Sequence, residues 1–178
     1  VCSLAHRGPD SLACQSYRQG QAGLGHARLA IIDLSTGDQP MSSHDGEVGL
    51  VFNGEIYNYV ELRSQLEKEG IAFSSKSDTE VILRLYERHG EAAINRLRGM
   101  FAFAIYDSKK EKLILARDRL GKKPLYYMER KNDILFASEL KAILAYLGKA
   151  PEVDWSFLPD YLMLGYIPQP ATPFRDIR

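Results

Sequence analysis

Three residues in this sequence carry groups suited to a reaction at a carbonyl carbon. Cys2 lies beside the first residue, and a cysteine near an amino terminus becomes nucleophilic when an adjacent amine takes its proton. Asn53 and Gly54, in the run VFNGEIYN, offer a side-chain amide and a backbone N–H, the donors that an oxyanion hole needs. Each also has a plainer explanation. Most buried cysteines are small apolar side chains, and Asn-Gly between apolar runs is the strongest short-range signal for a hairpin turn.

Three charged residues are also open to two interpretations. Arg28, in HARLAIID, suits a solvated strand position or a structural ion pair. Glu55 suits an ordinary charge beside a turn, and Asp78 suits a negative charge at the N-terminus of a helix. Taken singly, each of the three is better explained by structure than by catalysis.

Composition narrows the classes of function. The chain has 178 residues, 45% of them hydrophobic and 26% charged, which suits one domain with room for a core of two or more layers. Lys and Arg number 23, as do Asp and Glu, so the formal net charge is zero and lacks the basic excess of a nucleic-acid binder. We therefore expect a small molecule or another protein as partner, and no nucleic acid.

The spacing of the cysteines and histidines indicates whether the chain binds a metal and which cellular compartment it suits. Cys2 and Cys14 form no C-x-x-C pair and the four histidines lack zinc-ligand spacing, so we expect no metal and no disulfide framework. This usage suits a reducing compartment such as the cytoplasm. The sequence has no apolar run of membrane-helix length and no signal-peptide region. It begins at Val1 rather than Met, so we expect the natural N-terminus to lie upstream.

Hydrophobic periodicity predicts the elements that must position these groups. We expect strands in AGLGHARLAIID and EVGLVFNGEIYNY, and a helix in YVELRSQLEKEG with Val60, Leu62 and Leu66 on one stripe. In SDTEVILRLYERHG, the S-x-x-E pattern of Ser77 and Glu80 predicts a capping box at the start of a second helix.

The second half of the sequence predicts four strands followed by two helices. Four strand candidates, MFAFAIYD, KLILARD, PLYYM and DILFAS, suggest an antiparallel meander with SKKE and RKND as turns. Helices are expected in SELKAILAYL and in VDWSFLPDYLMLGY, the latter interrupted at Pro159. From Pro168, three prolines in six positions predict an extended linker. The mixture favours an α+β fold with mainly antiparallel sheets.

Seven motifs together resemble, in order and spacing, the glutaminase domain of glutamine-dependent asparagine synthetases: AHRGPD, GHARLAIIDLSTGDQPM, FNGEIYNY, SDTEVIL, RGMFAFAIYD, ARDRLGKKPLYY and FASELKAI. The resemblance covers nearly the whole chain and indicates a class II glutamine amidotransferase, a branch of the N-terminal-nucleophile hydrolases. It implies a four-layer αββα sandwich. Residues 1–150 would form the glutaminase domain without its N-terminal strand, and residues 151–178 a linker towards an ATP-dependent synthetase domain.

The resemblance also implies a binding site for L-glutamine. Arg28 is similar to the arginine that clamps the α-carboxylate, a task that suits the two-pronged guanidinium. Glu55 and Asp78 resemble the carboxylates that receive the α-ammonium group. Leu29 and Ile31 resemble pocket residues whose backbone groups contact the substrate.

The catalytic groups follow from the same resemblance. The Asn53 amide and the Gly54 N–H resemble the oxyanion hole, which overrides the hairpin interpretation. In this family the nucleophilic cysteine is the first residue of the mature chain. A strand, a loop and a helix, roughly twenty residues on average element lengths, then precede H-R-G-P-D. Cys2 stands four residues before His6, at the expected end of that helix, and Cys14 falls in the following strand or loop. The nucleophile is therefore expected outside this sequence.

The implied activity is the release of ammonia from glutamine for the ATP-dependent amidation of aspartate to asparagine. We expect ATP and Mg²⁺ on the synthetase domain of the same protein and no cofactor on these residues. Association as a homodimer stays open. Two alternatives also remain: a sister amidotransferase with another acceptor, and a non-catalytic glutamine-binding or structural module, as a naturally shortened relative would be.

The 178-residue chain should therefore release no ammonia from glutamine, and Cys2→Ala should make no difference to that result. The reason is that Cys2 stands at the start of the H-R-G-P-D loop, where no nucleophile is expected. Ammonia release by the purified chain and by its Cys2→Ala form checks this. Hydrolysis that Cys2→Ala abolishes would identify Cys2 as the nucleophile.

Overall fold

A computed structural model describes residues 1–29 and 37–178, and its contacts divide the chain into two units, Val1–Lys123 and Pro124–Arg178. The strands of the first unit are β1 (Ser11–Tyr17), β2 (Ala22–Arg28), β3 (Met41–Ser42), β4 (Val48–Ile56), β5 (Gly99–Asp107) and β6 (Lys112–Arg117). Its helices are α1 (Tyr59–Lys68), α2 (Asp78–His89) and the short 3-10 helices η1 (Cys2–Arg7), η2 (Arg18–Gly20) and η3 (Gly90–Arg96).

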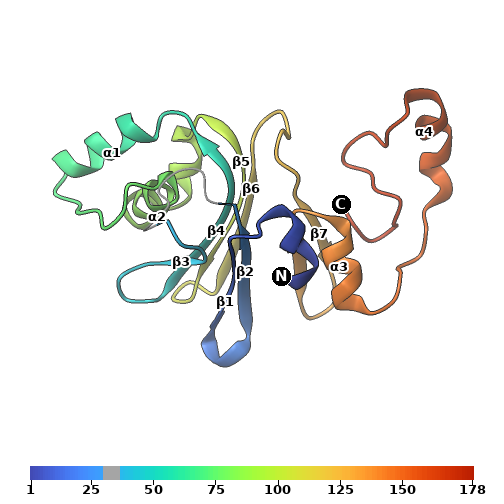
Figure 1. Cartoon of the computed structure of the whole chain (residues 1–178), viewed down its shortest axis with the longest axis horizontal. Helices are drawn as coiled ribbons and strands as arrows, with labels where there is room; N and C mark the ends of the chain where they lie inside the picture. Colours follow the sequence, from blue (N-terminus) through green and yellow to red (C-terminus); the bar gives the residue numbers. More distant parts are fainter. Residues whose placement is uncertain (30–36) are drawn as a thin grey trace. The chain divides into compact units, whose positions relative to one another are not determined.

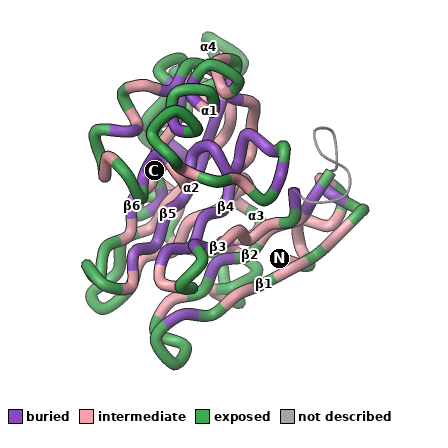
Figure 2. Tube along the Cα trace, turned by 90° about the vertical axis from the view of Figure 1, so that its left-hand side faces the viewer, coloured by how far each residue is buried: buried purple, intermediate pink, exposed green. Residues whose placement is uncertain are grey.

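The first unit is built on an antiparallel sheet with the strand order β3-β4-β5-β6. The two central strands, β4 and β5, are mostly buried along their length, as Figure 2 shows. Both α-helices lie on one side of this sheet (Figure 1). Leu62 and Leu66 of α1, with Leu83 and Leu85 of α2, meet alternate residues of β4 and β5 in one core. Burial of each such side chain contributes about 1.5–3 kcal/mol.

The opposite face of the sheet carries the hairpin of β1 and β2. Successive strand residues point to opposite faces, so Gly49 and Tyr106, which are paired across β4 and β5, face away from the helices. The Tyr17 ring of β1 packs against Tyr106 with centroids 5.6 Å apart. Helices, sheet and hairpin thus supply three layers of the predicted αββα arrangement, and the α+β class with antiparallel sheets is confirmed.

The start of α2 differs in one respect from the predicted capping box. Ser77 is the N-cap, and its Oγ accepts from the Thr79 N–H at 3.1 Å, as expected. The Glu80 carboxylate instead accepts backbone and hydroxyl hydrogen bonds from Ser74 and Ser75 in the preceding loop. Although burial acts to raise it, these bonds hold the pKa of Glu80 below its ordinary value. The predicted capping box is therefore wrong, because the Glu80 carboxylate accepts from Ser74 and Ser75 and not from the N–H of Ser77.

The structure corrects one further expectation in the first unit and decides between the two interpretations of the Asn-Gly pair. Val60 was predicted on the stripe of Leu62 and Leu66, but it is 61% exposed, because residues two apart lie on different faces of a helix. The Asn-Gly pair forms no hairpin turn, since Asn53 and Gly54 lie inside β4.

The predicted four-strand meander is also divided in two. Strands β5 and β6 pair with each other, as do β7 (Tyr126–Glu129) and β8 (Ile134–Ala137), but no described strand pairing joins β6 to β7. After β6 the Asp118 carboxylate turns the chain by accepting from the backbone N–H groups of Phe101, Leu120, Lys122 and Lys123.

The second unit contains the β7–β8 hairpin, α3 (Leu140–Leu147), η4 (Trp155–Phe157) and α4 (Leu158–Leu164). Pro159 stands in the first turn of α4, so the helical segment is interrupted just before it. The stretch predicted as an extended linker packs within this unit: Ile177 is fully buried, and Arg178 exchanges both backbone hydrogen bonds with Tyr127. The role of residues 151–178 as a linker to a further domain stays a prediction. Among the described residues, no helix has the length and apolar character to cross a membrane.

Replacing Gly54 by Ala should lower the free energy of unfolding by about 2 kcal/mol or more. Gly54 has a φ of +151°, and an added Cβ would clash with the Met100 carbonyl oxygen of the neighbouring strand. Gly23→Ala is the matched control, because the nearest atom to its added Cβ lies 4.0 Å away. Urea unfolding of both variants measures the difference, and equal losses would contradict the close approach of the two strands.

Candidate active site

The candidate site lies along the outer edge of β4, beyond the end of β3. Strand β3 pairs only with Gly49 and Leu50. In an antiparallel strand alternate residues direct both backbone groups to the same side, so Phe52, Gly54 and Ile56 present theirs at this edge. The edge is therefore open to side chains from other elements.

Phe52 is held at this edge by two side chains. Gln39 Oε1 accepts from the Phe52 N–H at 2.6 Å, and Gln39 Nε2 donates to the Phe52 carbonyl at 3.1 Å. The same Gln39 Nε2 lies 3.3 Å from Thr79 Oγ1 of α2. His26 of β2 places its Nε2 3.1 Å from the same Phe52 carbonyl oxygen. Phe52 thus ties the hairpin, β4 and the start of α2 together.

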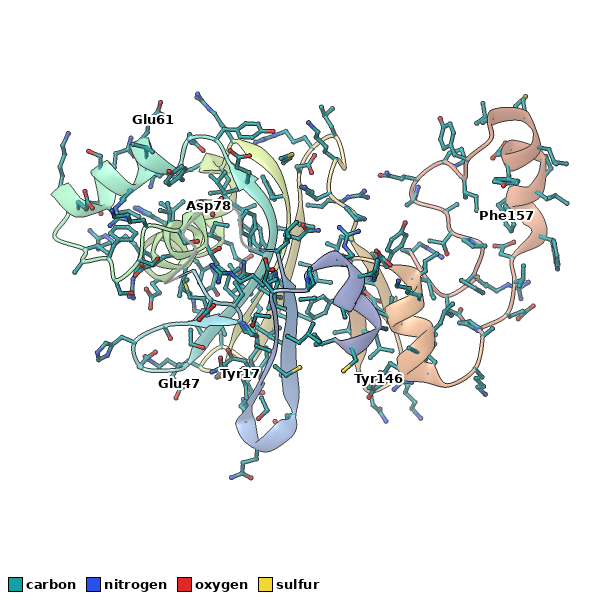
Figure 3. The ribbon with its side chains drawn as sticks, in the orientation of Figure 1. Tyr17, Glu47, Glu61, Asp78, Tyr146 and Phe157 are labelled. Carbon is teal, nitrogen blue, oxygen red and sulfur yellow. The ribbon has the colours of Figure 1, made fainter. Side chains whose placement is uncertain are left out.

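Asp78 closes the other end of the edge. Its Oδ2 accepts from the Ile56 N–H at 3.0 Å, and the residue is 4% exposed. In Figure 3, Asp78 lies in the interior at the start of α2, whereas Glu61 projects outward from α1. Burial raises the pKa of Asp78; hydrogen bonds from backbone N–H groups, including that of Ile56, oppose the rise, and the charge of Glu55 adds to it. A cation placed between Glu55 and Asp78 would relieve this repulsion.

Asn53 and Gly54 lie between these two ends. The Asn53 Nδ2 atom is buried and has no hydrogen-bond partner among the described residues. Such a group costs about 1–3 kcal/mol unless something accepts its hydrogen bond. Gly54 directs its N–H to the edge between Phe52 and Ile56, where the described residues supply it with no partner. Two adjacent residues therefore offer donors to a developing negative charge.

Arg28 lies at the end of β2, two residues beyond His26. It is 9% exposed, and its guanidinium pairs with the exposed Asp38 carboxylate at 2.9 Å. Burial lowers the pKa of His26; the hydrogen bond to Phe52 opposes this, and the Arg28 charge reinforces it. Leu29 follows with 55% of its surface exposed. Ile31, the other predicted pocket residue, lies outside the described residues.

The geometry brings most of the predicted residues to one region and adds three. Asn53, Gly54, Glu55 and Asp78 gather along β4 and the start of α2, and Arg28 joins through its neighbour His26. The sequence interpretation missed His26, Gln39 and Thr79. His26 was detectable, since residues two apart in a strand share a face and it stands two positions before Arg28. Gln39 lies in a run of turn formers, which carries no such signal.

Cys14 lies in a strand, as the sequence analysis expected, whereas Cys2 begins a 3-10 helix rather than ending a helix. Cys2 is in η1, Cys14 is on β1, and both are exposed and free. Within residues 1–29 and 37–178, no group of three or more His, Cys, Asp or Glu side chains is arranged to hold a metal ion.

Comparison with known proteins defines the class. Residues 1–178 match the family described as glutamine amidotransferase domain, so the chain belongs to that family. Within it, the chain resembles asparagine synthetases of the glutamine-hydrolysing type. It is 43% identical over 169 residues to asparagine synthetase 1 of Bacillus subtilis, covering 95% of this chain and 26% of that protein.

Two other relatives widen the comparison. A putative asparagine synthetase 2 of Methanocaldococcus jannaschii is 39% identical over 193 residues, covering 98% of this chain and 37% of that protein. Amidase chry2 of Gibberella zeae is 44% identical over 150 residues, covering 84% of this chain and 22% of that protein. The chain thus spans between about a fifth and a little over a third of these relatives.

A solved structure supports the fold assignment. Glutamine phosphoribosylpyrophosphate amidotransferase from B. subtilis matches with a TM-score of 0.57 and 30% identity, over 74% of this chain and 31% of that protein. The fold is that of the class II, N-terminal-nucleophile type of glutamine amidotransferase, as the sequence predicted.

Asp78→Asn should remove a pH dependence of stability without lowering the free energy of unfolding at neutral pH. Because the pKa of Asp78 is raised on folding, the folded chain binds more protons than the unfolded one just above the ordinary value of 3.8. Stability from this group therefore falls as the pH rises through that window. Urea unfolding of wild type and variant across this range measures the difference. Glu61→Gln, in the exposed first turn of α1, is the control, and a marked loss of stability at neutral pH would contradict the account.

Proposed function

We propose that this chain forms the glutaminase site of an amidotransferase that releases ammonia from L-glutamine. One observation carries the proposal: the Asn53 amide is buried and unpaired beside the Gly54 N–H, on a strand edge flanked by acidic side chains. Buried donors without partners suit a site that binds a developing oxyanion.

The binding of glutamine follows from the charges around this edge. The Arg28 guanidinium would bind the α-carboxylate in competition with Asp38, which is solvent-exposed and screened. Glu55 and Asp78 would receive the α-ammonium, whose charge offsets the repulsion between them. Backbone groups of Leu29 and Ile31 would complete the pocket. The side-chain amide of glutamine would then reach Asn53.

The chemistry would begin with a cysteine thiolate, supplied by residues outside this sequence. The thiolate adds to the amide carbon, and the negative charge that develops on oxygen accepts from Asn53 Nδ2 and the Gly54 N–H. The α-amine of that cysteine, which took the thiol proton, passes it to the nitrogen as the C–N bond breaks; ammonia leaves and a thioester remains. Water then hydrolyses the thioester to glutamate and regenerates the thiol.

The acceptor of the ammonia is aspartate in our proposal, because two of the three relatives compared by sequence above are named as asparagine synthetases, one of them as putative. ATP and Mg²⁺ would bind a further domain of the same protein, in the cytoplasm. The relative named as an amidase favours the alternative of another acceptor. The outer edge of β4 is compatible with both, since it would contact glutamine and not the acceptor.

Arg28→Lys in the full-length protein should raise the KM for glutamine about tenfold or more, because a point charge cannot reproduce a bidentate contact with a carboxylate. Synthesis from free ammonia should change little. The two reactions are measured separately. Arg88→Lys is the control, since Arg88 forms an exposed ion pair with Glu69 on the helices. Equal losses in both reactions of the Arg28 variant would exclude it from the glutamine pocket.

A further inference from the structure

The side chain of Gln39 takes the place of a missing strand. In the register of β3 and β4, Gln39 stands opposite Phe52, two residues beyond the last backbone pair, Met41 and Leu50. A backbone partner there would bond both Phe52 groups, and the Gln39 side chain does so in its stead. Both polar atoms of the Gln39 amide are engaged by Phe52 and Thr79, so we expect its effect on catalysis to pass through Phe52.

The position of Phe52 decides the position of Asn53. The Phe52 carbonyl and the Asn53 N–H belong to one planar peptide group, so a hydrogen bond that orients one orients the other. The next peptide carries the Gly54 N–H. Because Gly54 has a φ that other residues rarely adopt, the strand relies on outside contacts to hold this conformation.

His26 supplies the second contact to the same carbonyl. A carbonyl oxygen only accepts, so His26 Nε2 carries the proton and donates, which leaves Nδ1 unprotonated. His26 Nδ1 is buried and has no partner in the described part of the chain. Burial and the Arg28 charge keep the pKa of His26 low, whereas its hydrogen bond to Phe52 acts to raise it. The neutral ring therefore holds Phe52 without adding a buried charge.

We propose that Gln39, assisted by His26, is a positioning residue for the reaction: it clamps Phe52 and so aligns the Asn53 amide and the Gly54 N–H on the oxyanion. Thr79 links the clamp to Asp78, its neighbour at the start of α2. The two ends of the glutamine site are thereby kept in register. The inference rests on the proposed glutaminase function.

The test uses the full-length protein with Gln39→Leu, Gln39→Glu and the control Gln65→Leu, a glutamine on the exposed side of α1 that also accepts a hydrogen bond. Gln39→Leu should lower the kcat for glutamine hydrolysis about tenfold or more, with less than about a threefold change in KM. Gln39→Glu keeps the acceptor for the Phe52 N–H but turns a second acceptor oxygen toward the Phe52 carbonyl, so it should also lower kcat. Gln65→Leu should behave as wild type.

A double-mutant cycle shows whether Gln39 acts through Asn53. Asn53→Ala alone should lower kcat about a hundredfold, the scale of one lost oxyanion donor. Adding Gln39→Leu should then cost less than it does in the wild type, because one of the two donors that Gln39 positions is gone. Losses that multiply in full, or a raised KM with unchanged kcat, would overturn the proposal. If Gln39→Leu fails to fold, Gln39→Glu enters the cycle in its place.

A second measurement separates this inference from the proposed function. In protein labelled with ¹⁵N-glycine, the Gly54 amide signal should shift in Gln39→Glu and stay in place in Gln65→Leu, whether or not the protein hydrolyses glutamine. An unmoved Gly54 signal would overturn the clamp even in an active enzyme. Wild-type protein that shows no glutamine hydrolysis would instead overturn the function on which the catalytic role rests.

Discussion

The open edge of β4 is the constraint on which the rest of this site depends. Phe52, Gly54 and Ile56 direct their backbone groups away from β5, and β3 is too short to pair with them. A buried backbone group left without a partner costs about 1–3 kcal/mol, so other elements must supply hydrogen bonds. Gln39 and Asp78 do this at the two ends, and the gap between them leaves donors available to a ligand.

The acidic charges at this edge lower the stability of the fold and at the same time favour the binding of a cation. Asp78 is buried, its pKa is raised by that burial, and Glu55 adds to the rise across the site while backbone N–H groups oppose it. Such an arrangement lowers the stability of the folded chain, and a cation bound between the two acids would relieve it. Glu80, two residues along the same helix, shows the opposite outcome: hydrogen bonds from four donor groups of Ser74 and Ser75 overcome its burial and keep its pKa low. The contrast separates an acid whose hydrogen bonds outweigh its burial from one whose burial outweighs them.

Local patterns in the sequence were enough to predict α1, α2, β2 and β4, because hydrophobic periodicity and caps are local signals. The chemistry of Asn53 and Gly54 was not predictable from spacing, since Asn-Gly favours a turn and only the full series of motifs assigned the pair to an oxyanion hole. The clamp by Gln39 was missed because a side chain that replaces a strand leaves no periodic trace. The break between β6 and β7 was missed because Asp118 turns the chain by accepting hydrogen bonds from four backbone N–H groups. Backbone donors of this kind leave no pattern in the types of the neighbouring residues.

The structure of the full-length protein with glutamine bound tests the central claim most directly. We expect the glutamine α-carboxylate on Arg28, the α-ammonium between Glu55 and Asp78, and the side-chain carbonyl oxygen within hydrogen-bond distance of Asn53 Nδ2 and the Gly54 N–H. Glutamine bound away from the β4 edge, or bound there with its amide directed away from Asn53, would contradict the assignment of this edge as the active site.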